Sequence, residues 1–347
     1  MNCIFNYSLQ ALEDKLLSLN LKKYNAKQIF EWIYKKKIFD FKQMTNLAKN
    51  TREVLDKNFI FNLLTIVKVS SDKKKEAIKF LFKLYDGNYI ETVVMQFNYG
   101  YSICISTQVG CNMGCKFCAS GANKKIRNLE PSEIVLQYLC AWQYLNKTKK
   151  INISNIVVMG IGEPFENYNN LIIALKTFIN PFGLQIGQRH ITVSTCGLVP
   201  KILHFAKDMP QVNLAISLHA TNNNLRSSLM PINKVYNLNV LIETCKKYLK
   251  MTNRRLTFEY ILLKNINDSQ KDALALVKLL KPLLCYVNLI PYNETDLCNY
   301  TRSDKINNFF NILNKNRLLA TIRLERGTKI DAACGQLRIK ECQKKKF

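Results

Sequence analysis

The sequence predicts an α/β protein in which six or so strand–helix units form an open or partial (β/α) barrel, preceded by a small all-helical domain. Short apolar runs rich in β-branched residues recur from residue 103 to residue 325, with helix-like segments between most of them. Residues 1–66 instead show helical periodicity and many lysines. The chain has 347 residues, 48% of them hydrophobic, which suits one large core with a smaller appendage.

The N-terminal segment, residues 1–66, is predicted to be helical throughout. The stretch NAKQIFEWIYKKKIF places Ile29, Phe30 and Ile33 on one side of a helix and lysines elsewhere. A second helix is expected over roughly residues 44–55. We therefore assign this segment to a basic accessory domain.

Residues 67–96 are predicted to form a β-rich extension that connects this domain to the barrel. The polar turn DKKKEAIK leads into strand-like alternation, AIKFLFKLYDGNYIETVVM, and Asp86-Gly87 marks a hairpin.

The barrel is assigned to residues 97–347. Its predicted strands are 103–107 (ICIST), 155–160 (NIVVMG), 190–195 (HITVST), 212–219 (VNLAISLH), 256–263 (LTFEYILL), 286–293 (YVNLIPYN) and 320–325 (ATIRLE). Helices are expected over 131–145 and 168–179, among others. Strands that alternate with helices at this spacing are parallel, and functional residues of such barrels lie beyond the strand carboxyl ends. Distinctive residues stand there: the turn Gly162-Glu163-Pro164, Ser194, His219 and Asn293.

The charge of the chain favours a polyanionic partner. Lys and Arg total 51 against 25 Asp and Glu, a formal net charge of +26, which indicates nucleic acid most simply. Codon bias of an AT-rich genome is an alternative explanation of the lysines. Since we find neither a run of roughly 18 uncharged apolar residues nor a secretory signal, we expect a cytoplasmic protein without membrane contact. Its 12 cysteines should then be mainly thiols or ligands.

Three cysteines, Cys111, Cys115 and Cys118, are spaced C-x3-C-x2-C within GCNMGCKFCAS. Structural zinc normally takes four ligands, yet the sequence has no second C-x2-C and only three histidines, so zinc is the weaker interpretation. Cysteines are the usual ligands of iron–sulfur clusters. Three of them on a [4Fe–4S] cluster leave one iron open to a substrate or cofactor.

This spacing, with Phe117 between the last two cysteines, resembles the radical S-adenosylmethionine (radical SAM) superfamily. A longer series of segments, in order along the barrel, is similar to the RlmN-type dual-specificity RNA methyltransferases. The segments are STQVGCNMGCKFCAS (106–120), RNLEPSEI (127–134), MGIGEPFENYNN (159–170), VSTCG (193–197), ISLHA (216–220), LMPINKVYN (229–237), NLIPYN (288–293) and IDAACGQL (330–337).

The resemblance implies the activity. Such enzymes methylate C2 of one adenine in 23S rRNA near the peptidyl-transferase centre, and of the adenine 3′ of the anticodon in tRNAs. It implies one [4Fe–4S] cluster on Cys111, Cys115 and Cys118, two SAM molecules per turnover and an external electron donor such as flavodoxin or a ferredoxin-like protein. The helical domain would bind RNA, with Lys35, Lys36 and Lys37 as hypothetical phosphate contacts. We expect a monomer.

The resemblance also assigns catalytic residues. Cys334 matches the cysteine that is methylated first and then passes its methyl carbon to the base. Cys104 matches the cysteine that forms a transient disulfide with Cys334 on release, and Glu91 matches the proton acceptor. Taken singly, these residues would be interpreted as a buried thiol, an inward-facing strand residue and a solvated carboxylate.

Contacts with SAM are likewise implied by the resemblance. Glycine lets a backbone approach a ligand closely, and carboxylate, hydroxyl, imidazole and amide groups can hydrogen-bond its polar atoms. The matching residues are Gly162, Glu163, Ser194, Ser217, Leu218, His219 and Asn293.

Two segments depart from the family pattern: SGANKKI (120–126), where a glycine pair is expected, and a short stretch at 293–303. Three alternatives remain at this point. One is a Cfr-type enzyme that methylates C8 of the same adenine, although the sequence has Pro164 where those enzymes tend to have alanine. The others are a non-catalytic metal-containing RNA-binding protein and a radical SAM enzyme acting on a small metabolite.

Overall fold

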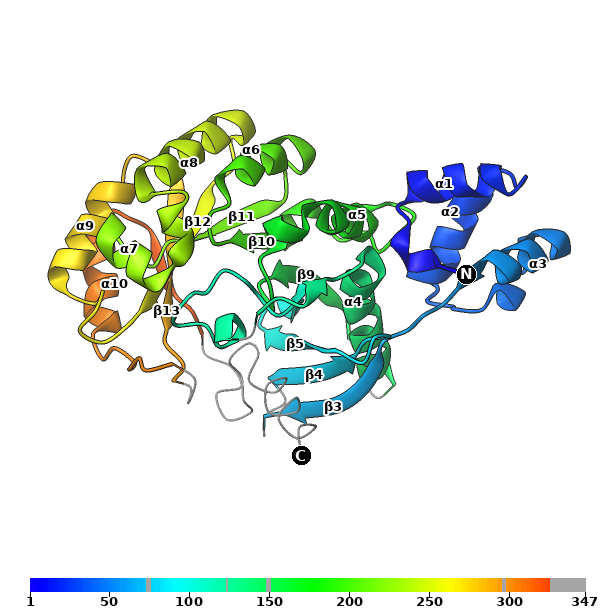
Figure 1. Ribbon diagram of the computed structural model, residues 1–347, viewed down its shortest axis with the longest axis horizontal. Helices are drawn as coiled ribbons and strands as arrows, with labels where there is room; N and C mark the ends of the chain where they lie inside the picture. Colours follow the sequence, from blue (N-terminus) through cyan, green and yellow to red (C-terminus); the bar gives the residue numbers. More distant parts are fainter. Residues whose placement is uncertain (73–75, 123, 148–150, 295–297, 325–347) are drawn as a thin grey trace.

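A single mixed sheet organises the molecule. The computed structural model describes residues 1–72, 76–122, 124–147, 151–294 and 298–324. Within these ranges the main sheet has ten strands in the order β14-β13-β12-β11-β10-β9-β6-β5-β4-β3. Helices lie along the outer side of this curved sheet, from α4 to α10 (Figure 1). The largest hydrophobic cluster fills the space between the sheet and the helices.

Seven strands form the parallel part of the sheet, each paired in parallel with the next along the order. They are β6 (Gly100–Cys104), β9 (Ile153–Val158), β10 (Ile191–Thr195), β11 (Asn213–Ser217), β12 (Leu256–Leu262), β13 (Cys285–Pro291) and β14 (Ala320–Ile322). The crossover helices are α4 (Pro131–Asn146), α5 (Tyr168–Ile179), α6 (Val199–Asp208), α7 (Asn223–Leu229), α8 (Leu238–Thr252), α9 (Gln270–Leu280) and α10 (Ile306–Lys315). The predicted alternation of strands and helices in a partial barrel is confirmed.

Capping residues mark the start of two of these helices, α4 and α9. The Glu130 side chain accepts a hydrogen bond from the backbone N–H of the third helical residue of α4, and the Glu133 carboxylate accepts one from the Glu130 N–H at 2.9 Å. Pro131 suits the first turn. Ser269 and Asp272 form the equivalent capping box of α9. The helices that the structure describes include no candidate for a membrane span.

An antiparallel extension continues the same sheet beyond β6. It consists of β3 (Thr65–Ser71), β4 (Ala77–Lys83) and β5 (Tyr89–Phe97). The predicted hairpin at Asp86-Gly87 is confirmed: Gly87 adopts a φ of +82° and its N–H donates to Leu84 O at 3.0 Å. Strand β3 begins at Thr65, just before the predicted end of the N-terminal domain at residue 66. The domain bounds stay a prediction. A two-stranded antiparallel pair, β7 (Gln108–Val109) with β8 (Arg127–Asn128), flanks the cysteine segment.

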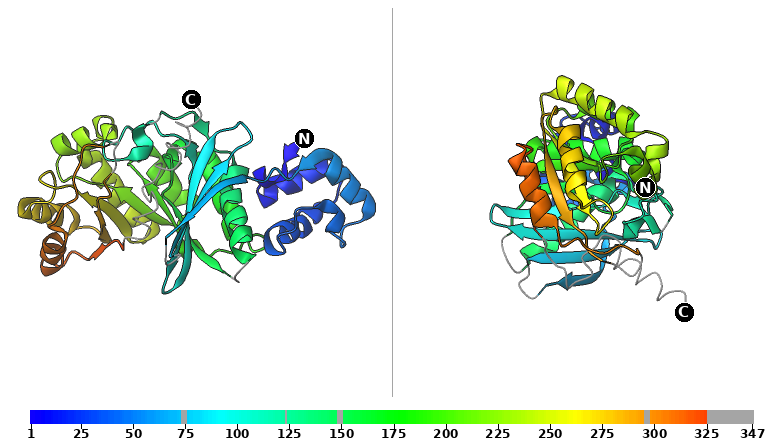
Figure 2. Two further views of the ribbon diagram at one scale, coloured as in Figure 1. Left: turned by 90° about the horizontal axis from the view of Figure 1, so that it is seen from below. Right: turned by 90° about the vertical axis from the view of Figure 1, so that its left-hand side faces the viewer.

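The N-terminal domain lies at the end of the molecule away from α9 and α10 (Figure 2). Its helices are α1 (Leu9–Ser18), α2 (Asn25–Phe30) with a π-helical continuation over Glu31–Lys35, and α3 (Lys49–Asn58). The second helix, expected over residues 44–55, begins later because Met44 and Leu47 are buried in the preceding turns. A short parallel pair, β1 (Asn2–Cys3) with β2 (Phe59–Ile60), also joins the two ends of this otherwise helical domain.

The lysines proposed as phosphate contacts pack against aromatic rings. The Lys35 ammonium lies 5.6 Å from the ring centre of Phe182, and that of Lys37 lies 4.2 Å from the ring centre of Trp142 in α4. Lys36 lies 3.4 Å from the ring centre of Trp32, inside its own domain. Burial lowers the pKa of Lys37. Two of the three lysines therefore link the N-terminal domain to the barrel, and their contact with RNA stays a hypothesis.

The double substitution Lys35→Ala/Lys37→Ala should loosen this domain contact by about 1–2 kcal/mol, because each cation–π contact contributes about 0.5–1 kcal/mol or more. Hydrogen exchange of residues 2–60 and of α4 measures the effect, and both regions should exchange faster. Lys36→Ala is the matched control, since its ring partner belongs to the same domain. Equal exchange in both variants would contradict the assignment.

Candidate active site

The cysteine segment crosses the carboxyl edge of the parallel sheet. It begins after β7, the short strand that follows β6 in the chain. The Lys116 N–H donates to Leu229 O, at the end of α7, at 2.9 Å. The Cys118 N–H donates to Cys115 O at 3.1 Å, which closes a turn between two of the three thiols. The ring of Phe117 lies 4.7 Å from the His219 ring, in edge contact. The segment therefore reaches from β6 to the residues that follow β11.

Gln108 holds the turn after β9 against the start of this segment. Its Oε1 accepts a hydrogen bond from the Glu163 N–H at 2.8 Å, and its Nε2 donates to Glu166 Oε2 at 3.0 Å. Gly162 has a φ of +109°, and a Cβ there would lie 2.6 Å from Gln108 Cβ. The glycine is thus required by contact with Gln108, whereas its predicted contact with SAM stays a prediction.

Glu163 is buried and its carboxylate is already held by backbone groups. Oε1 accepts from the Phe165 N–H at 3.0 Å, and Oε2 accepts from the Cys196 N–H at 2.8 Å. Burial raises the pKa of Glu163, and the two backbone hydrogen bonds oppose this effect. The carboxylate therefore ties the turn after β9 to the residue that follows β10.

The three predicted cluster ligands, Cys111, Cys115 and Cys118, are each partly buried. Burial raises the pKa of Cys111 to about 12, and the negative charges that Cys118 and Glu163 can carry act in the same direction. Burial and nearby negative charges also raise the pKa of Cys115. The hydrogen bond from the Cys118 N–H to Cys115 O keeps these two residues within one turn. Such thiols ionise readily only beside a cation, so this donor set fits an iron–sulfur cluster. Within the described residues, no three or more His, Cys, Asp or Glu side chains are arranged to hold a single metal ion.

His219 lies just beyond β11 with a left-handed backbone, φ +58°. Its Nδ1 accepts a hydrogen bond from the Ile261 N–H at 3.1 Å, which leaves Nε2 as the protonated nitrogen of the neutral ring. The buried Asn267 side chain donates to His219 O at 2.9 Å and to Ile261 O at 2.7 Å. Burial and the charge of Arg226 lower the pKa of His219 to about 3, so the ring is neutral at physiological pH.

Arg226 is a central residue of this edge that the sequence analysis missed. Its side chain is fully buried, and its guanidinium donates to Leu218 O at 3.2 Å, Ser217 O at 3.1 Å and Cys196 O at 2.8 Å. A fourth bond goes to Asn233 Oδ1 at 3.0 Å. It therefore fixes the ends of β10 and β11 together. Its signal in the sequence is weak, because one arginine in NNLRSSLMPIN resembles a solvated helix residue.

The remaining predicted SAM contacts follow the same edge. Ser194 lies inside β10 rather than beyond it, one residue before its end, because the strand continues to Thr195. Ser217 is the last residue of β11, and Asn293 comes two residues after β13; both are partly exposed. Leu218 is fully buried and its N–H donates to Glu259 O at 3.0 Å, so its side chain belongs to the core.

The predicted catalytic residues Glu91 and Cys104 lie on β5 and β6 respectively, and both are buried. Glu91 Oε2 lies 2.8 Å from the ammonium group of Lys79 on β4, a partner that the sequence analysis did not identify. The third residue, Cys334, lies outside the described residues. The structure records no disulfide among the cysteines that it describes, and the transient pairing of Cys104 with Cys334 stays a prediction.

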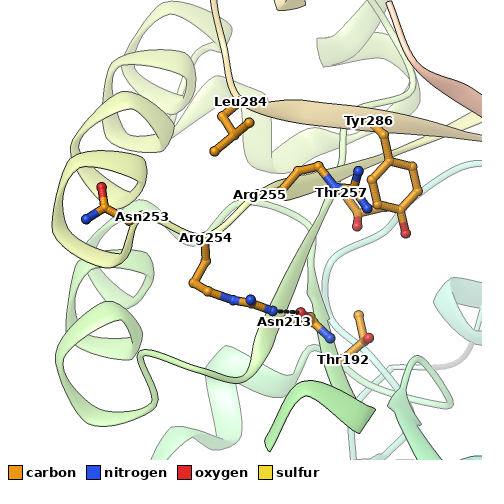
Figure 3. Close-up of a pocket in the computed structure, with 8 residues that line it drawn as sticks. All are labelled: Thr192, Asn213, Asn253, Arg254, Arg255, Thr257, Leu284 and Tyr286. Atoms are coloured by element: carbon orange, nitrogen blue, oxygen red, sulfur yellow. Dashed lines mark hydrogen bonds between the residues drawn. The ribbon is translucent and has the colours of Figure 1, made fainter.

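A polar pocket of about 450 Å³ opens at the opposite edge of the sheet (Figure 3). Its lining residues are Thr192, Asn213, Asn253, Arg254, Arg255, Thr257, Leu284 and Tyr286. The Arg254 guanidinium donates to Asn213 Oδ1 at 2.7 Å, and that of Arg255 lies 4.7 Å from the ring centre of Tyr286. Since these residues belong to the amino ends of β10 to β13, the pocket is not part of the candidate active site.

Comparison with known proteins identifies the family. A model of the ribosomal RNA large subunit methyltransferase N-terminal domain matches residues 2–60, and one of the radical SAM superfamily matches residues 105–277. The chain is 52% identical over 341 residues to a probable dual-specificity RNA methyltransferase RlmN of Malacoplasma penetrans, covering 98% of this chain and 97% of that protein. It is 52% identical over 340 residues to the corresponding protein of Spiroplasma citri, covering 98% of each. The chain belongs to the RlmN family.

A solved structure agrees with this membership of the RlmN family. The radical SAM methyltransferase from Sphaerobacter thermophilus matches with a TM-score of 0.90 and 41% identity, covering 97% of this chain and 99% of that one. The predicted fold and family are confirmed, and the Cfr-type alternative is not favoured. Membership of the radical SAM superfamily implies a [4Fe–4S] cluster and SAM.

The neutral His219 ring should make stability depend on pH. Its folded-state pKa, about 3, lies below the value near 6.5 of an unfolded histidine, so the unfolded chain binds the proton first as the pH falls. The contribution of the neutral His219 ring to the free energy of unfolding is therefore complete above pH 6.5. It decreases by about 2 kcal/mol as the pH falls from 7 to 5.

Anaerobic denaturant titration of His219→Asn tests this prediction. Asparagine keeps an acceptor near Nδ1 and tolerates the left-handed backbone, yet it does not titrate. Between pH 7 and pH 5 the free energy of unfolding should decrease by about 2 kcal/mol less in His219→Asn than in the unsubstituted protein. The control His204→Asn, at an exposed position, should show the same decrease as the unsubstituted protein. An identical loss in all three proteins would refute it.

Proposed function

We propose that this protein methylates C2 of a specific adenine in 23S rRNA and of the adenine 3′ of the anticodon in tRNAs, through an S-methylcysteine intermediate. One observation carries the proposal: three thiols lie on a single segment across the carboxyl edge of a partial barrel. The Phe117 ring of this segment contacts His219, and Gln108, just before the segment, accepts a hydrogen bond from the Glu163 N–H. Relatives that match nearly the whole chain are named dual-specificity RNA methyltransferases.

The cofactors fit this edge of the sheet. When bound, the cluster and SAM supply a 5′-deoxyadenosyl radical, which can activate a carbon atom that polar chemistry does not reach. Cys111, Cys115 and Cys118 would hold the cluster. Ser194, the Ser217–His219 segment and Asn293 offer hydroxyl, imidazole, backbone and amide groups for SAM, and Gly162 and Glu163 complete the predicted set.

Three residues of the chain have the remaining roles in the proposed reaction. Cys334 accepts a methyl group from one SAM, and a second SAM is consumed when that methyl carbon is activated, so each turnover requires two. Glu91 takes up the proton that C2 loses. Cys104 then pairs with Cys334 as the methylated base is released.

The partners follow from this chemistry. The basic surface of the N-terminal domain would bind RNA phosphates, and extrusion of the target base would bring C2 to the edge of the sheet. A flavodoxin or ferredoxin-like protein would supply electrons. The enzyme is proposed to act as a monomer in the cytoplasm, where its RNA substrates are found.

Mass spectrometry of RNA tests the function directly. Anaerobically reconstituted protein should contain about four irons per chain, the number in a [4Fe–4S] cluster, and should convert adenosine in 23S rRNA and tRNA fragments to 2-methyladenosine. Cys118→Ala should lose both iron and product. Cys334→Ala should keep its iron but lose product, and it serves as the matched control. Formation of the 8-methyl isomer, or methylation by Cys118→Ala, would reject the proposal.

Cys104→Ala should trap the protein on its RNA substrate, because the carbon bond to C2 still forms while the release step lacks its thiol. Denaturing gel electrophoresis should show a covalent complex in the presence of SAM and reductant. Cys140→Ala is a suitable control, since Cys140 is another buried cysteine of the barrel, on α4. Normal release of product from Cys104→Ala would remove this role.

A further inference from the structure

A buried ion pair lies between strands β4 and β5. Lys79 Nζ is 2.8 Å from Glu91 Oε2, and the exposed fractions of the two side chains are 0% and 3%. Burying two charges is unfavourable for stability, and replacing such a pair with apolar residues is often neutral or stabilising. Stability therefore does not explain why this ion pair is buried.

Both charged side chains point away from helix α4. Thr92 Oγ1 donates to Gln137 Oε1 of α4 at 2.8 Å, and the ring of Phe80 contacts an aromatic ring of the same helix. Successive side chains of a strand point to opposite faces of the sheet. Glu91 and Lys79, the neighbours of Thr92 and Phe80, therefore lie on the inner face, opposite the helices.

Cys104 shares this inner face. Val93 is the register partner of both Cys104 on β6 and Lys79 on β4, and register partners on adjacent strands point the same way. Glu91 stands two residues before Val93 and so lies on the same face. The residues proposed as proton acceptor and as releasing thiol are thus near neighbours, and Lys79 lies beside them.

We propose that Lys79 is a positioning residue of the methyl transfer, whose ammonium group keeps the Glu91 carboxylate ionised and directed over the inner face. This inference rests on the proposed function, in which Glu91 accepts the proton of adenine C2. In that step the C2–H bond breaks, an O–H bond forms on Glu91, and the electron pair of the C–H bond stays with the ring. A carboxyl group that already carried a proton could not accept this one.

Within the part of the chain that the structure describes, Lys79 is the cation paired with Glu91. Tyr89 and Cys104 also face Glu91, from β5 and β6, and neither is a cation. Lys68 on β3 and Lys83 at the end of β4 are exposed, so water screens their charges. Without a nearby cation, a buried carboxylate takes up a proton because burial disfavours its charged form.

The test measures the rate of 2-methyladenosine formation from pH 6 to pH 9 in Lys79→Met, relative to the unsubstituted enzyme at each pH. The relative rate at pH 7 should fall by about 10- to 100-fold and should increase as the pH rises, because burial without a cation disfavours the charged form of a carboxyl group. Lys83→Met, on the same strand and face, is the matched control and should show a constant ratio near one. A pH-independent ratio for Lys79→Met would overturn the proposal.

A second comparison applies even if Lys79→Met does not fold. In the Glu91→Gln background, Lys79→Met leaves no buried charge from this pair, so the double variant is expected to fold. If Lys79 acts only through Glu91, Glu91→Gln and the double variant should have equal residual rates. A further loss of more than about threefold in the double variant would show a separate role and reject the inference.

One readout separates failure of this inference from failure of the proposed function. The intact mass of each variant reports methylation of Cys334, which precedes the proton transfer and should be unchanged in Lys79→Met. An unsubstituted enzyme that makes no 2-methyladenosine would reject the proposed function. Product from the unsubstituted enzyme, together with a pH-independent ratio for Lys79→Met, would reject only the role of Lys79.

Discussion

The parallel alignment of seven strands is the constraint on which the candidate site depends. Each of these strands ends at the same edge, so segments that are distant in the sequence meet there. Phe117, which follows β7, contacts His219, which follows β11, and the Cys196 N–H after β10 donates to Glu163 after β9. Without parallel crossovers these residues would lie at different edges. The fold therefore brings these segments together at one edge.

Buried polar groups then fix the assembled edge. Arg226 donates to carbonyl groups at the ends of β10 and β11, and Glu163 accepts from backbone N–H groups at two turns. The side chain of Asn267 holds the backbone of His219. Because leaving any of these buried groups without a partner is strongly unfavourable, each one restricts the backbone to a single arrangement. A rigid edge of this kind can position a cofactor without reorganisation during the reaction.

The inner face of the sheet adds a second set of chemical groups from the antiparallel extension. Strands β4 and β5 are continuous with β6, so the register of the ladder places Lys79, Glu91 and Cys104 on one face. The extension is therefore continuous with the main sheet rather than a separate connector. Meanwhile the N-terminal domain contacts α4 through Lys37 and Trp142, on the outer side. The domain contact and the buried Lys79–Glu91 pair thus lie on opposite faces of the sheet.

The sequence by itself determined the order of strands and helices, the hairpin at Asp86-Gly87 and the cysteine spacing, because periodicity, turn residues and ligand motifs are local properties. It placed the second N-terminal helix too early, since burial of Met44 and Leu47 in turns depends on packing. Only the tertiary structure decided the partners of Arg226, Gln108 and Lys79. A lysine or arginine read alone indicates a solvated surface. Strand register and long-range burial, which no local pattern encodes, determine the buried partners of these residues.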